Sequence, residues 1–453
     1  MAHGMNIAII GGCGYVGLIT GLGFAELGHR VIAIDRDAER VKFHQGGRSH
    51  IYEDGLHEVL ERLLADGSIR FTTDLATGIA DTEIIFVAVG SPAGIDGAAD
   101  LTQVRAVSAE LAELASPGAV IVIKSTVPIG AIELMSETVK ERNSGSGAPE
   151  IIVNPEFLSE GKGLYDFFNP TRIVIGGGSG STRARMRSLY EPFTRGGTSR
   201  AGREMLQNVP YLEVPIAEAQ MIKYASNAYL ASRISFVNEI ASICEVVGAD
   251  VTSVTAAMGL DPRIGPSYLR AGIGFGGPCL EKDLDALVGF ARDHDYEPDY
   301  LNAVRARNDE QMESVLTRVA EMLGGEVSGK RICLLGLAFN PGTNDVRTSL
   351  SLRIARSLIS AGASIAAHDP VAIEEARQLM PEIDYSDDLY DAASGADLLL
   401  LLTSWPEYGN LDPGHLLETM RTPLVFDGQN AMDNVSLVTR GFRYRSVGKP
   451  DPE

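Results

Sequence analysis

The sequence is poor in cysteine and has no cysteine or histidine pattern that would hold a metal. Only four cysteines occur in 453 residues, at Cys13, Cys244, Cys279 and Cys333, and none belongs to a CxxC pair. The eight histidines show no metal-ligand spacing. These absences argue against a disulfide framework and a zinc site. They predict a protein with reduced thiols and no bound metal, as is usual in the cytoplasm.

Positive charge is also scarce. The chain has 39 Lys and Arg residues against 60 Asp and Glu residues, which gives a formal net charge of -21. Nucleic acids and membrane surfaces both require basic patches, so neither is expected as a partner. The start of the sequence lacks the features of a signal peptide, and no apolar run is long enough to span a membrane. A local positive pocket for an anionic ligand is compatible with this composition.

The sequence does contain strand-like apolar runs that alternate with helical stretches. Residues 6–12, 30–35 and 83–90 are strand-like and residues 17–28 are helical in pattern, which predicts an α/β fold with a parallel sheet covered on both faces. A weaker repeat of this pattern begins near residue 330, but its segment GLAFNPGTND lacks the GxGxxG spacing. The second copy is therefore not expected to hold a dinucleotide in the same way.

Between these two patterns, residues 215–248 predict one long helix. Apolar and small residues recur there at helical spacing, with Pro215 at the start and Gly248 at the end. Apolar residues occupy much of its circumference, so the helix is expected to be buried on several sides. Such a helix suits a hinge between domains or a dimer interface.

A glycine-rich turn follows the first strand. Gly12, Gly14 and Gly17 form GxGxxG at the start of a helix, and Asp35 ends the next strand about 20 residues further on. The helix N-terminus would receive a pyrophosphate, and the carboxylate would accept the ribose hydroxyls. This context favours dinucleotide binding over a plain packing turn. Asp35 favours NAD over NADP, although the neighbouring Arg36 leaves NADP open.

Polar residues follow two more strands of the first pattern. Ser125 and Thr126 come after one strand, and Glu156 and Glu160 come after the next. Ligands of such folds bind at the carboxyl edge of the sheet, so these hydroxyls and carboxylates are candidates for a site. Turn capping and surface solvation are the alternative roles for each residue.

Two donors lie on the long predicted helix. Lys223 and Asn227 are four residues apart and share one face. A lysine on an apolar helix is costly to bury unless an anion meets it. The pair could therefore stabilise a developing oxyanion, or the lysine could extend to solvent.

One cysteine stands out from the other three. In GFGGPCLEKD, Gly274, Gly276 and Gly277 leave the approach to Cys279 free of side chains, and a lysine and an aspartate follow. A thiol at a helix N-terminus beside a cation ionises more readily, and the thiolate is the reactive form. Cys279 is thus a candidate nucleophile, with a buried structural thiol as the alternative.

Taken together, these segments resemble the UDP-glucose/GDP-mannose dehydrogenase family. The resemblance rests on GCGYVGL, STVPIG, NPEFLSEG, FNPTRIVIG, EAQMIKYASNAYLASRISFVNE, GFGGPCLEKD and GLAFNPGTNDVRTS, which occur in the family's order over nearly the whole chain. It implies two Rossmann-like doubly wound domains joined by the long helix, which would also build a homodimer. The expected domains are an NAD-binding domain at 1–212, a helical region at 213–320 and a nucleotide-sugar-binding domain at 321–453.

The resemblance also implies a reaction. Members of the family oxidise the C6 alcohol of a nucleotide sugar to a carboxylate and reduce two NAD, and UDP-glucose is the expected substrate here. Cys279 would carry a thiohemiacetal and then a thioester. Lys223 and Asn227 match oxyanion stabilisers, Asp283 matches a residue that assists water and base chemistry, and Thr126 and Glu160 match residues that hold a catalytic water.

The same matching implies ligand contacts. The cofactor would be contacted by Gly12, Gly14, Tyr15, Val16, Gly17, Asp35, Ser91, Thr126, Glu160 and Arg347. The nucleotide sugar would be contacted by Glu156, Phe157, Leu158, Lys223, Asn227, Tyr268 and Gly276, and by Arg263 reaching from one subunit to the site of the other.

Three positions depart from the family pattern. Ser91 replaces a cofactor-contacting threonine, Asn340 replaces a frequent lysine near the nucleotide sugar, and Glu281 replaces a common proline. The alternatives are the same chemistry on dTDP-glucose, GDP-mannose or a UDP-N-acetylhexosamine, a two-electron alcohol dehydrogenase, and a non-catalytic sensor. A sensor would have no use for the thiol nucleophile.

Overall fold

The computed structural model describes residues 4–90, 102–142, 148–196, 199, 205 and 207–450, and the predicted cofactor contact Ser91 lies outside them. The chain divides into two compact units. Unit 1 comprises Met1–Ser226 and Asp285–His294, and unit 2 comprises Asn227–Leu284 and Asp295–Glu453. Two helices contribute residues to both units, namely α10 (Ile216–Val247) and α12 (Leu280–Arg292).

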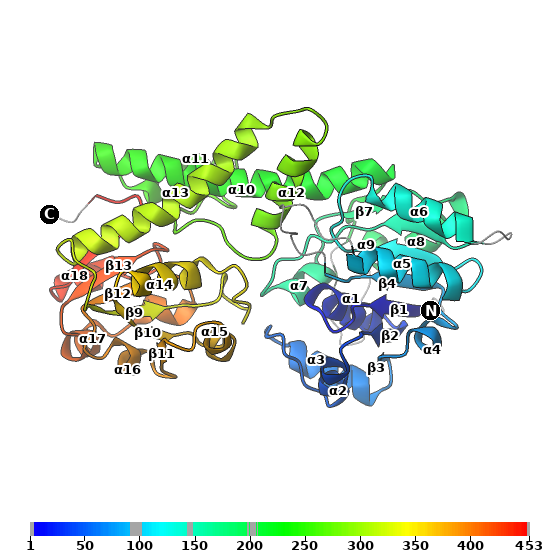
Figure 1. The fold of residues 1–453 in the computed structure, drawn as a ribbon, viewed down its shortest axis with the longest axis horizontal. Helices are drawn as coiled ribbons and strands as arrows, with labels where there is room; N and C mark the ends of the chain where they lie inside the picture. Colours follow the sequence, from blue (N-terminus) through cyan, green and yellow to red (C-terminus); the bar gives the residue numbers. More distant parts are fainter. Residues whose placement is uncertain are drawn as a thin grey trace. The chain divides into compact units, whose positions relative to one another are not determined.

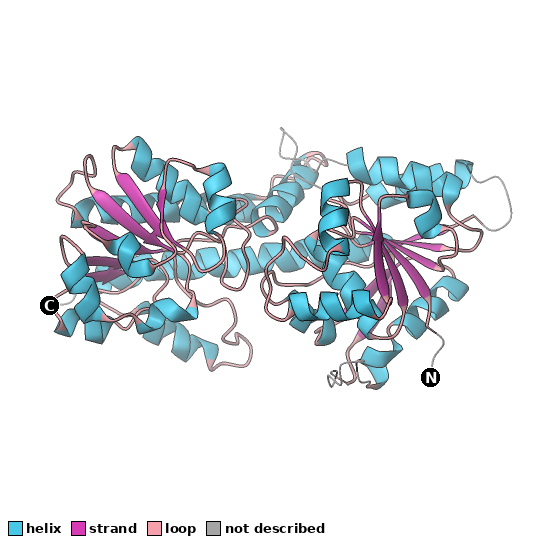
Figure 2. Ribbon diagram, turned by 90° about the horizontal axis from the view of Figure 1, so that it is seen from below, coloured by secondary structure: helices cyan, strands magenta, loops and turns pink. Residues whose placement is uncertain are grey.

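Unit 1 is built on an eight-stranded sheet with the strand order β3-β2-β1-β4-β5-β6-β7-β8, in which only β6 and β7 pair antiparallel. Its strands are β1 (Asn6–Ile10), β2 (Arg30–Ile34), β3 (Ile69–Thr72), β4 (Ile84–Val87), β5 (Val120–Ile123), β6 (Glu150–Val153), β7 (Ile173–Gly176) and β8 (Tyr211–Val214). Its helices are α1 (Tyr15–Glu26), α2 (Ala38–Gln45), α3 (Leu56–Ala65), α4 (Leu75–Ile79), α5 (Thr102–Leu114), α6 (Ala131–Arg142), α7 (Gly163–Phe168), α8 (Gly180–Leu189) and α9 (Glu191–Arg195). The helices lie on both faces of the sheet (Figures 1 and 2).

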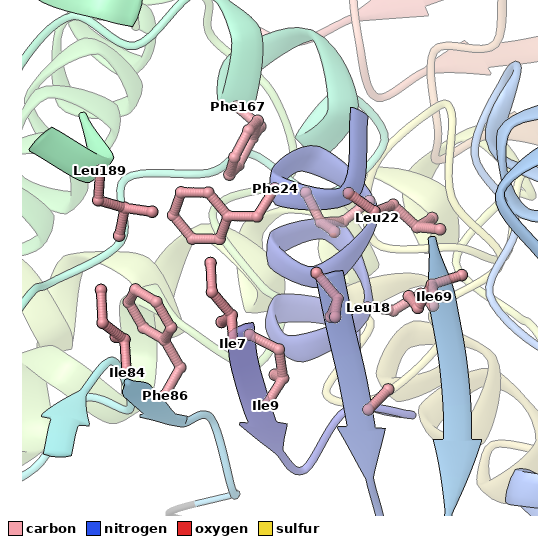
Figure 3. Packing of buried hydrophobic residues seen from close by; sticks show 14 of the residues in the cluster. Ile7, Ile9, Leu18, Leu22, Phe24, Ile69, Ile84, Phe86, Phe167 and Leu189 are labelled. Atoms are coloured by element: carbon pink, nitrogen blue, oxygen red, sulfur yellow. The ribbon is translucent and has the colours of Figure 1, made fainter. Parts of the chain in front are cut away.

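An aromatic cluster fixes α1 on the sheet. Phe24 of α1 stacks on Phe86 of β4 with ring centroids 5.2 Å apart, and Phe167 of α7 meets it edge-on at 5.3 Å. Leu189 and strand residues such as Ile7 complete the cluster (Figure 3). Because close-packed cores allow little movement, this cluster sets where α1 begins, and therefore where the glycine turn lies.

Unit 2 repeats the order of the first six strands of unit 1. Its parallel sheet has the order β11-β10-β9-β12-β13-β14. The strands are β9 (Arg331–Leu335), β10 (Ser364–His368), β11 (Asp384–Tyr385), β12 (Leu398–Leu401), β13 (Leu424–Asp427) and β14 (Arg443–Ser446). The helices are α11 (Val251–Gly259), α13 (Asp299–Met322), α14 (Leu350–Ser360), α15 (Ile373–Leu379), α16 (Leu389–Ala393), the 3-10 helix η1 (Pro406–Asn410), α17 (Pro413–Thr419) and α18 (Asn434–Thr439). The predicted class of two Rossmann-like domains with a long central helix is confirmed.

The long helix α10 also has the predicted ends, but its burial differs from the prediction. Pro215 precedes it, and Gly248 follows with φ +72°, the left-handed conformation that ends many helices. One face is buried, whereas Tyr229, Phe236 and Ile243 are 61%, 48% and 53% exposed. The apolar residues around α10 thus belong to two faces, one that is buried and one that is exposed. Within the described residues, no helix has both the length and the hydropathy to span a bilayer.

Candidate functional site

The glycine turn between β1 and α1 is shaped by close backbone contacts. A Cβ on Gly17 would lie 2.2 Å from the Gly11 carbonyl oxygen, and one on Gly12 would lie 2.7 Å from the Ala33 Cβ. Both positions therefore exclude a side chain. Gly14 is the N-cap of α1 and brings no capping side chain, so the N–H groups of Tyr15 and Val16 open the helix without one. This turn can receive a phosphate group.

Asp35 is positioned at the end of β2 beside this turn. Its Oδ2 accepts the Cys13 N–H at 3.2 Å and its Oδ1 accepts the Asp37 N–H at 3.1 Å, while the side chain is only half-buried. Backbone donors thus fix the carboxylate and leave it accessible for ribose hydroxyls. The Cys13 thiol is unsuited to chemistry, because burial and then the charge of Asp35 raise its pKa to about 12.

A buried ion pair lies beyond β6. Lys223 of α10 donates from Nζ to Glu156 Oε1 at 2.8 Å, and Glu156 Oε2 accepts the Leu158 N–H at 2.6 Å. Burial opposes ionisation of Glu156, but the charge and hydrogen bonds of Lys223 and the Leu158 amide keep its pKa below the ordinary value. Lys223 therefore has the buried anionic partner that the sequence required, and it does not extend to solvent.

Other predicted residues of unit 1 lie around this pair. Glu156, Phe157 and Leu158 line one cavity together with Lys124 and Arg172, whose guanidinium lies 3.8 Å from the centre of the Phe157 ring. Thr126 follows β5 and lines a small void with Lys223. Glu160 is half-buried in the segment between β6 and α7.

Two further polar residues at this edge of the sheet form hydrogen bonds within unit 1. Ser125 Oγ donates to the Val89 carbonyl at 2.6 Å, so its hydroxyl is engaged in the fold. Lys124, which the sequence reading missed, donates from Nζ to Asn154 Oδ1 at 3.2 Å. Burial lowers the pKa of Lys124 from 10.5 to about 8, Glu156 opposes this change, and Lys223 adds to it. The only sequence signal for Lys124 is a lysine directly after an all-apolar strand.

In unit 2, the candidate nucleophile lies directly before α12. Cys279 is exposed, and its carbonyl accepts the N–H of Asp283 at 3.0 Å in the first turn of the helix. The Asp283 carboxylate is 1% exposed, and it accepts Asn227 Nδ2 at 2.6 Å through Oδ2 and Lys282 Nζ at 2.6 Å through Oδ1. The structure thus brings together three of the predicted catalytic residues, with Lys282 as a partner of the carboxylate.

The loop that carries Cys279 is held by buried amides that the sequence reading missed. Asn308 of α13 accepts the Phe275 N–H at 2.7 Å and donates to the Phe275 carbonyl at 2.9 Å. Gln311, one turn further, donates to the Gly272 carbonyl at 2.7 Å. Gly277 has φ +84°, and a Cβ there would lie 2.5 Å from Phe339. Amides three residues apart on the buried face of a helix are the signal that could have revealed this support.

Three other predicted residues of unit 2 are exposed. The guanidinium groups of Arg263 and Arg347 are exposed and pair with Asp261 and Asp345, respectively, which lie two residues earlier. Tyr268 is 41% exposed with φ +58°.

Two further positions of unit 2 are fixed by close contacts. A Cβ on Gly276 would lie 2.9 Å from the Thr348 carbonyl oxygen, so this position accepts only glycine. Glu281, one of the departures, pairs with Arg353 at 3.0 Å and with Arg305 at 3.5 Å, so it anchors the start of α12. The ligand roles of all these residues remain predictions.

Comparison with protein families decides what kind of protein carries these sites. Residues 5–194 match the NAD binding domain of the UDP-glucose/GDP-mannose dehydrogenase family, residues 217–310 its central domain, and residues 333–434 its UDP binding domain. The chain belongs to this family. The predicted family, the oxidoreductase activity and NAD as the cofactor are confirmed, and the glycine turn with Asp35 has the shape and donors to hold NAD.

Individual relatives of this dehydrogenase cover almost the whole chain. UDP-glucose 6-dehydrogenase YwqF of Bacillus subtilis is 39% identical over 446 residues, which is 98% of each chain. UDP-glucose 6-dehydrogenase of Rhizobium meliloti is 39% identical over 99% of this chain and 100% of its own. Among solved structures, a UDP-glucose dehydrogenase from Pyrobaculum islandicum has a TM-score of 0.86 at 36% identity and covers 96% of both chains.

Proposed function

We propose that this dehydrogenase oxidises the C6 hydroxyl of UDP-glucose to a carboxylate and so forms UDP-glucuronate. The full-length relatives named UDP-glucose 6-dehydrogenase support this substrate. The observation that carries the mechanism is the position of Cys279 directly before α12, one turn from a buried Asp283 that Asn227 and Lys282 hold. A two-electron alcohol oxidation would need no such thiol.

Two oxidations share one nucleophile in this proposal. NAD, when bound, supplies the acceptor for the hydride that leaves C6 in each oxidation. The first oxidation gives an aldehyde, to which the Cys279 thiolate adds by forming a bond between Sγ and C6. The second oxidation converts this thiohemiacetal to a thioester. Water then bonds to C6, the C6–S bond breaks, and the carboxylate and the thiolate are released.

The neighbouring side chains have separate tasks. Asn227 and Lys223 donate hydrogen bonds to the oxygen on C6 as negative charge develops there. Asp283 assists the water and accepts its proton. Thr126 and Glu160 hold the water, and Glu156 positions Lys223 through their buried ion pair.

The same function implies which residues contact the two ligands and how the chain is divided into domains. The sugar nucleotide is contacted by Glu156, Phe157, Leu158, Lys223, Asn227, Tyr268, Gly276 and, from the second subunit, Arg263. The cofactor is contacted by Gly12, Gly14, Tyr15, Val16, Gly17, Asp35, Ser91, Thr126, Glu160 and Arg347. The division at 1–212, 213–320 and 321–453 and a cytoplasmic location are parts of the same proposal.

The homodimer is supported by the open face of α10. Tyr229, Phe236 and Ile243 are spaced seven residues apart, so they form one apolar stripe on the helix. Such a stripe is unusual on a free surface and could pack on its own copy about a two-fold axis. Light scattering of Phe236→Glu should give half the mass of the unmodified protein, and an unchanged mass would exclude this interface.

The decisive experiment counts NADH formed per UDP-glucose consumed, for the unmodified protein and for Cys279→Ser. A ratio of about two, with loss of steady turnover in the variant, is expected for the thioester route. A ratio of about one would mean release at the aldehyde and would remove the role of Cys279. No NADH from UDP-glucose, but turnover of another sugar nucleotide in a substrate panel, would reject the substrate and keep the chemistry.

A further inference from the structure

A buried carboxylate that none of the predicted roles uses lies between α2 and α3. Glu53 is 6% exposed, and both of its oxygens accept hydrogen bonds within unit 1. Oε2 accepts the Tyr15 hydroxyl at 2.6 Å and the Gly163 N–H at 2.9 Å, and Oε1 accepts the Leu164 N–H at 2.5 Å. These three hydrogen bonds satisfy the buried carboxylate and hold it in place.

These bonds join two segments that are far apart in the sequence. Tyr15 is the first residue of α1 and follows the glycine turn, whereas Gly163 and Leu164 begin α7. The Tyr15 hydroxyl also lies 3.2 Å from the Ser159 carbonyl and 3.1 Å from the Gly163 N–H. The cofactor turn and the 159–164 segment are therefore linked through one side chain.

The linked segment contains Glu160. Burial first, and then the negative charge of Glu53, raise the pKa of Tyr15 above its ordinary value, and the charge of Glu160 contributes as well. The charge of Glu160 is thus close enough to Tyr15 to affect the ionisation of the phenol. Ser159 and Gly163 lie on either side of Glu160, and both contact the Tyr15 hydroxyl. The position of Glu160 therefore depends on these contacts.

We propose that Glu53 is a positioning residue that holds the 159–164 segment against Tyr15 and so places Glu160 for the hydrolysis of the thioester on Cys279. This inference rests on the proposed function, since it assigns Glu53 to the last step of that route. In that step the water oxygen bonds to C6, its proton goes to a carboxylate, and the C6–S bond breaks. The two hydride transfers do not need this water.

The substitution Glu53→Gln tests the proposal with almost no change of volume. Glutamine has one acceptor oxygen in place of two. Its NH2 group cannot accept a hydrogen bond, so at least one N–H or O–H donor that now bonds to Glu53 loses its acceptor. We expect kcat to fall about 10- to 100-fold, because small displacements of a catalytic group have effects of this size. KM for UDP-glucose should change by less than about 3-fold, since Glu53 bonds to none of the residues proposed to contact the sugar nucleotide.

The diagnostic measurement is the mass of the quenched enzyme during turnover. Glu53→Gln should form about two NADH per active site in a burst and then accumulate a covalent sugar-nucleotide adduct on Cys279. The unmodified protein and Glu58→Gln, the same change at an exposed site of α3, should show a several-fold smaller adduct fraction. Tyr15→Phe leaves the two backbone N–H bonds to Glu53 in place but removes the contacts of the hydroxyl to Glu53, Ser159 and Gly163, and it should also raise the adduct fraction.

Each result decides between the two proposals. If the unmodified protein forms two NADH per substrate but neither Glu53→Gln nor Tyr15→Phe raises the adduct fraction, Glu53 has no positioning role. If the unmodified protein forms one NADH per substrate, the thioester route itself is wrong and the Glu53 proposal is rejected with it. If Glu53→Gln fails to fold, the adduct fraction of Tyr15→Phe decides.

Discussion

The two units contain the same strand–turn–strand element and use its aspartate in opposite ways. In unit 1, Asp35 follows β2 and accepts two backbone N–H groups while it remains half-buried. In unit 2, Asp369 follows β10 and is 1% exposed. Its Oδ2 accepts the N–H groups of Leu337 and Ala338 at 2.7 and 3.1 Å and the indole N–H of Trp405 at 3.1 Å.

This difference shows how the same position in a fold can serve ligand binding in one unit and structural support in the other. Oδ1 of Asp369 also accepts two N–H groups, those of Val371 and Ala372, both at 3.0 Å. Every acceptor position of this carboxylate is directed at the protein, so none remains for a ribose. Asp35 retains that capacity. The fold therefore provides the position for a nucleotide site, and the hydrogen bonds of one carboxylate decide whether a site exists there.

The largest expected effect comes from removing the carboxylate of unit 2. Asp369→Ala leaves five donors without an acceptor, and it should lower the free energy of unfolding by about 3 to 5 kcal/mol. Trp405 is the only tryptophan in the chain and lies in unit 2, so its fluorescence during urea unfolding reports this unit directly. A loss below about 1 kcal/mol would show that the two aspartates are equivalent.

The same substitution in unit 1 should act on binding instead. Asp35→Ala is expected to weaken NAD about 10- to 100-fold, because a hydrogen bond to a charged group is lost, while unfolding changes by less than about 1 kcal/mol. Isothermal titration calorimetry measures the affinity. The matched control is Asp37→Ala, which removes the cap of α2 and should leave the affinity within about 3-fold. Equal effects of the two variants would contradict the assignment of Asp35.

A smaller effect on stability is expected from a second difference between the units, which is the sign of a buried charge at the end of the fifth strand. Lys124 follows β5 in unit 1, whereas the buried Asp427 ends β13, the fifth strand of the same order, in unit 2. Because the pKa of Lys124 is lowered to about 8 in the folded protein, the unfolded chain binds more protons above that pH. The contribution of Lys124 to the free energy of unfolding therefore rises with pH between about 8 and 10.5.

The substitution Lys124→Met removes this contribution. The unmodified protein should gain about 1 to 2 kcal/mol of stability relative to the variant between about pH 7 and pH 9.5. Urea unfolding at both pH values measures the difference, with the exposed Lys42→Met of α2 as the control. A pH-independent difference would mean that Lys124 titrates at its ordinary value.

Local sequence patterns were sufficient for the fold and for the separate motifs. Apolar runs, glycine spacing and the Asp35 position predicted both Rossmann-like patterns, the long helix and the cofactor, because hydrophobic periodicity and turn geometry depend on short segments. The glycine approach to Cys279 and the helix behind it were predicted for the same reason. What these patterns could not predict was support from distant segments. Asn308 lies 33 residues from Phe275, and Glu53 lies 110 residues from Gly163.

The sequence by itself therefore determined which segments form the sheets and where the glycine turn lies, whereas the exposure of Cys279 was decided by the structure. It did not determine that Asp35 stays open while Asp369 is saturated, since both simply follow a strand. The partners that distinguish them include Trp405, which is 36 residues away from Asp369. Only the tertiary structure brings such donors together, because hydrogen-bond saturation depends on distance in space and not on separation along the chain.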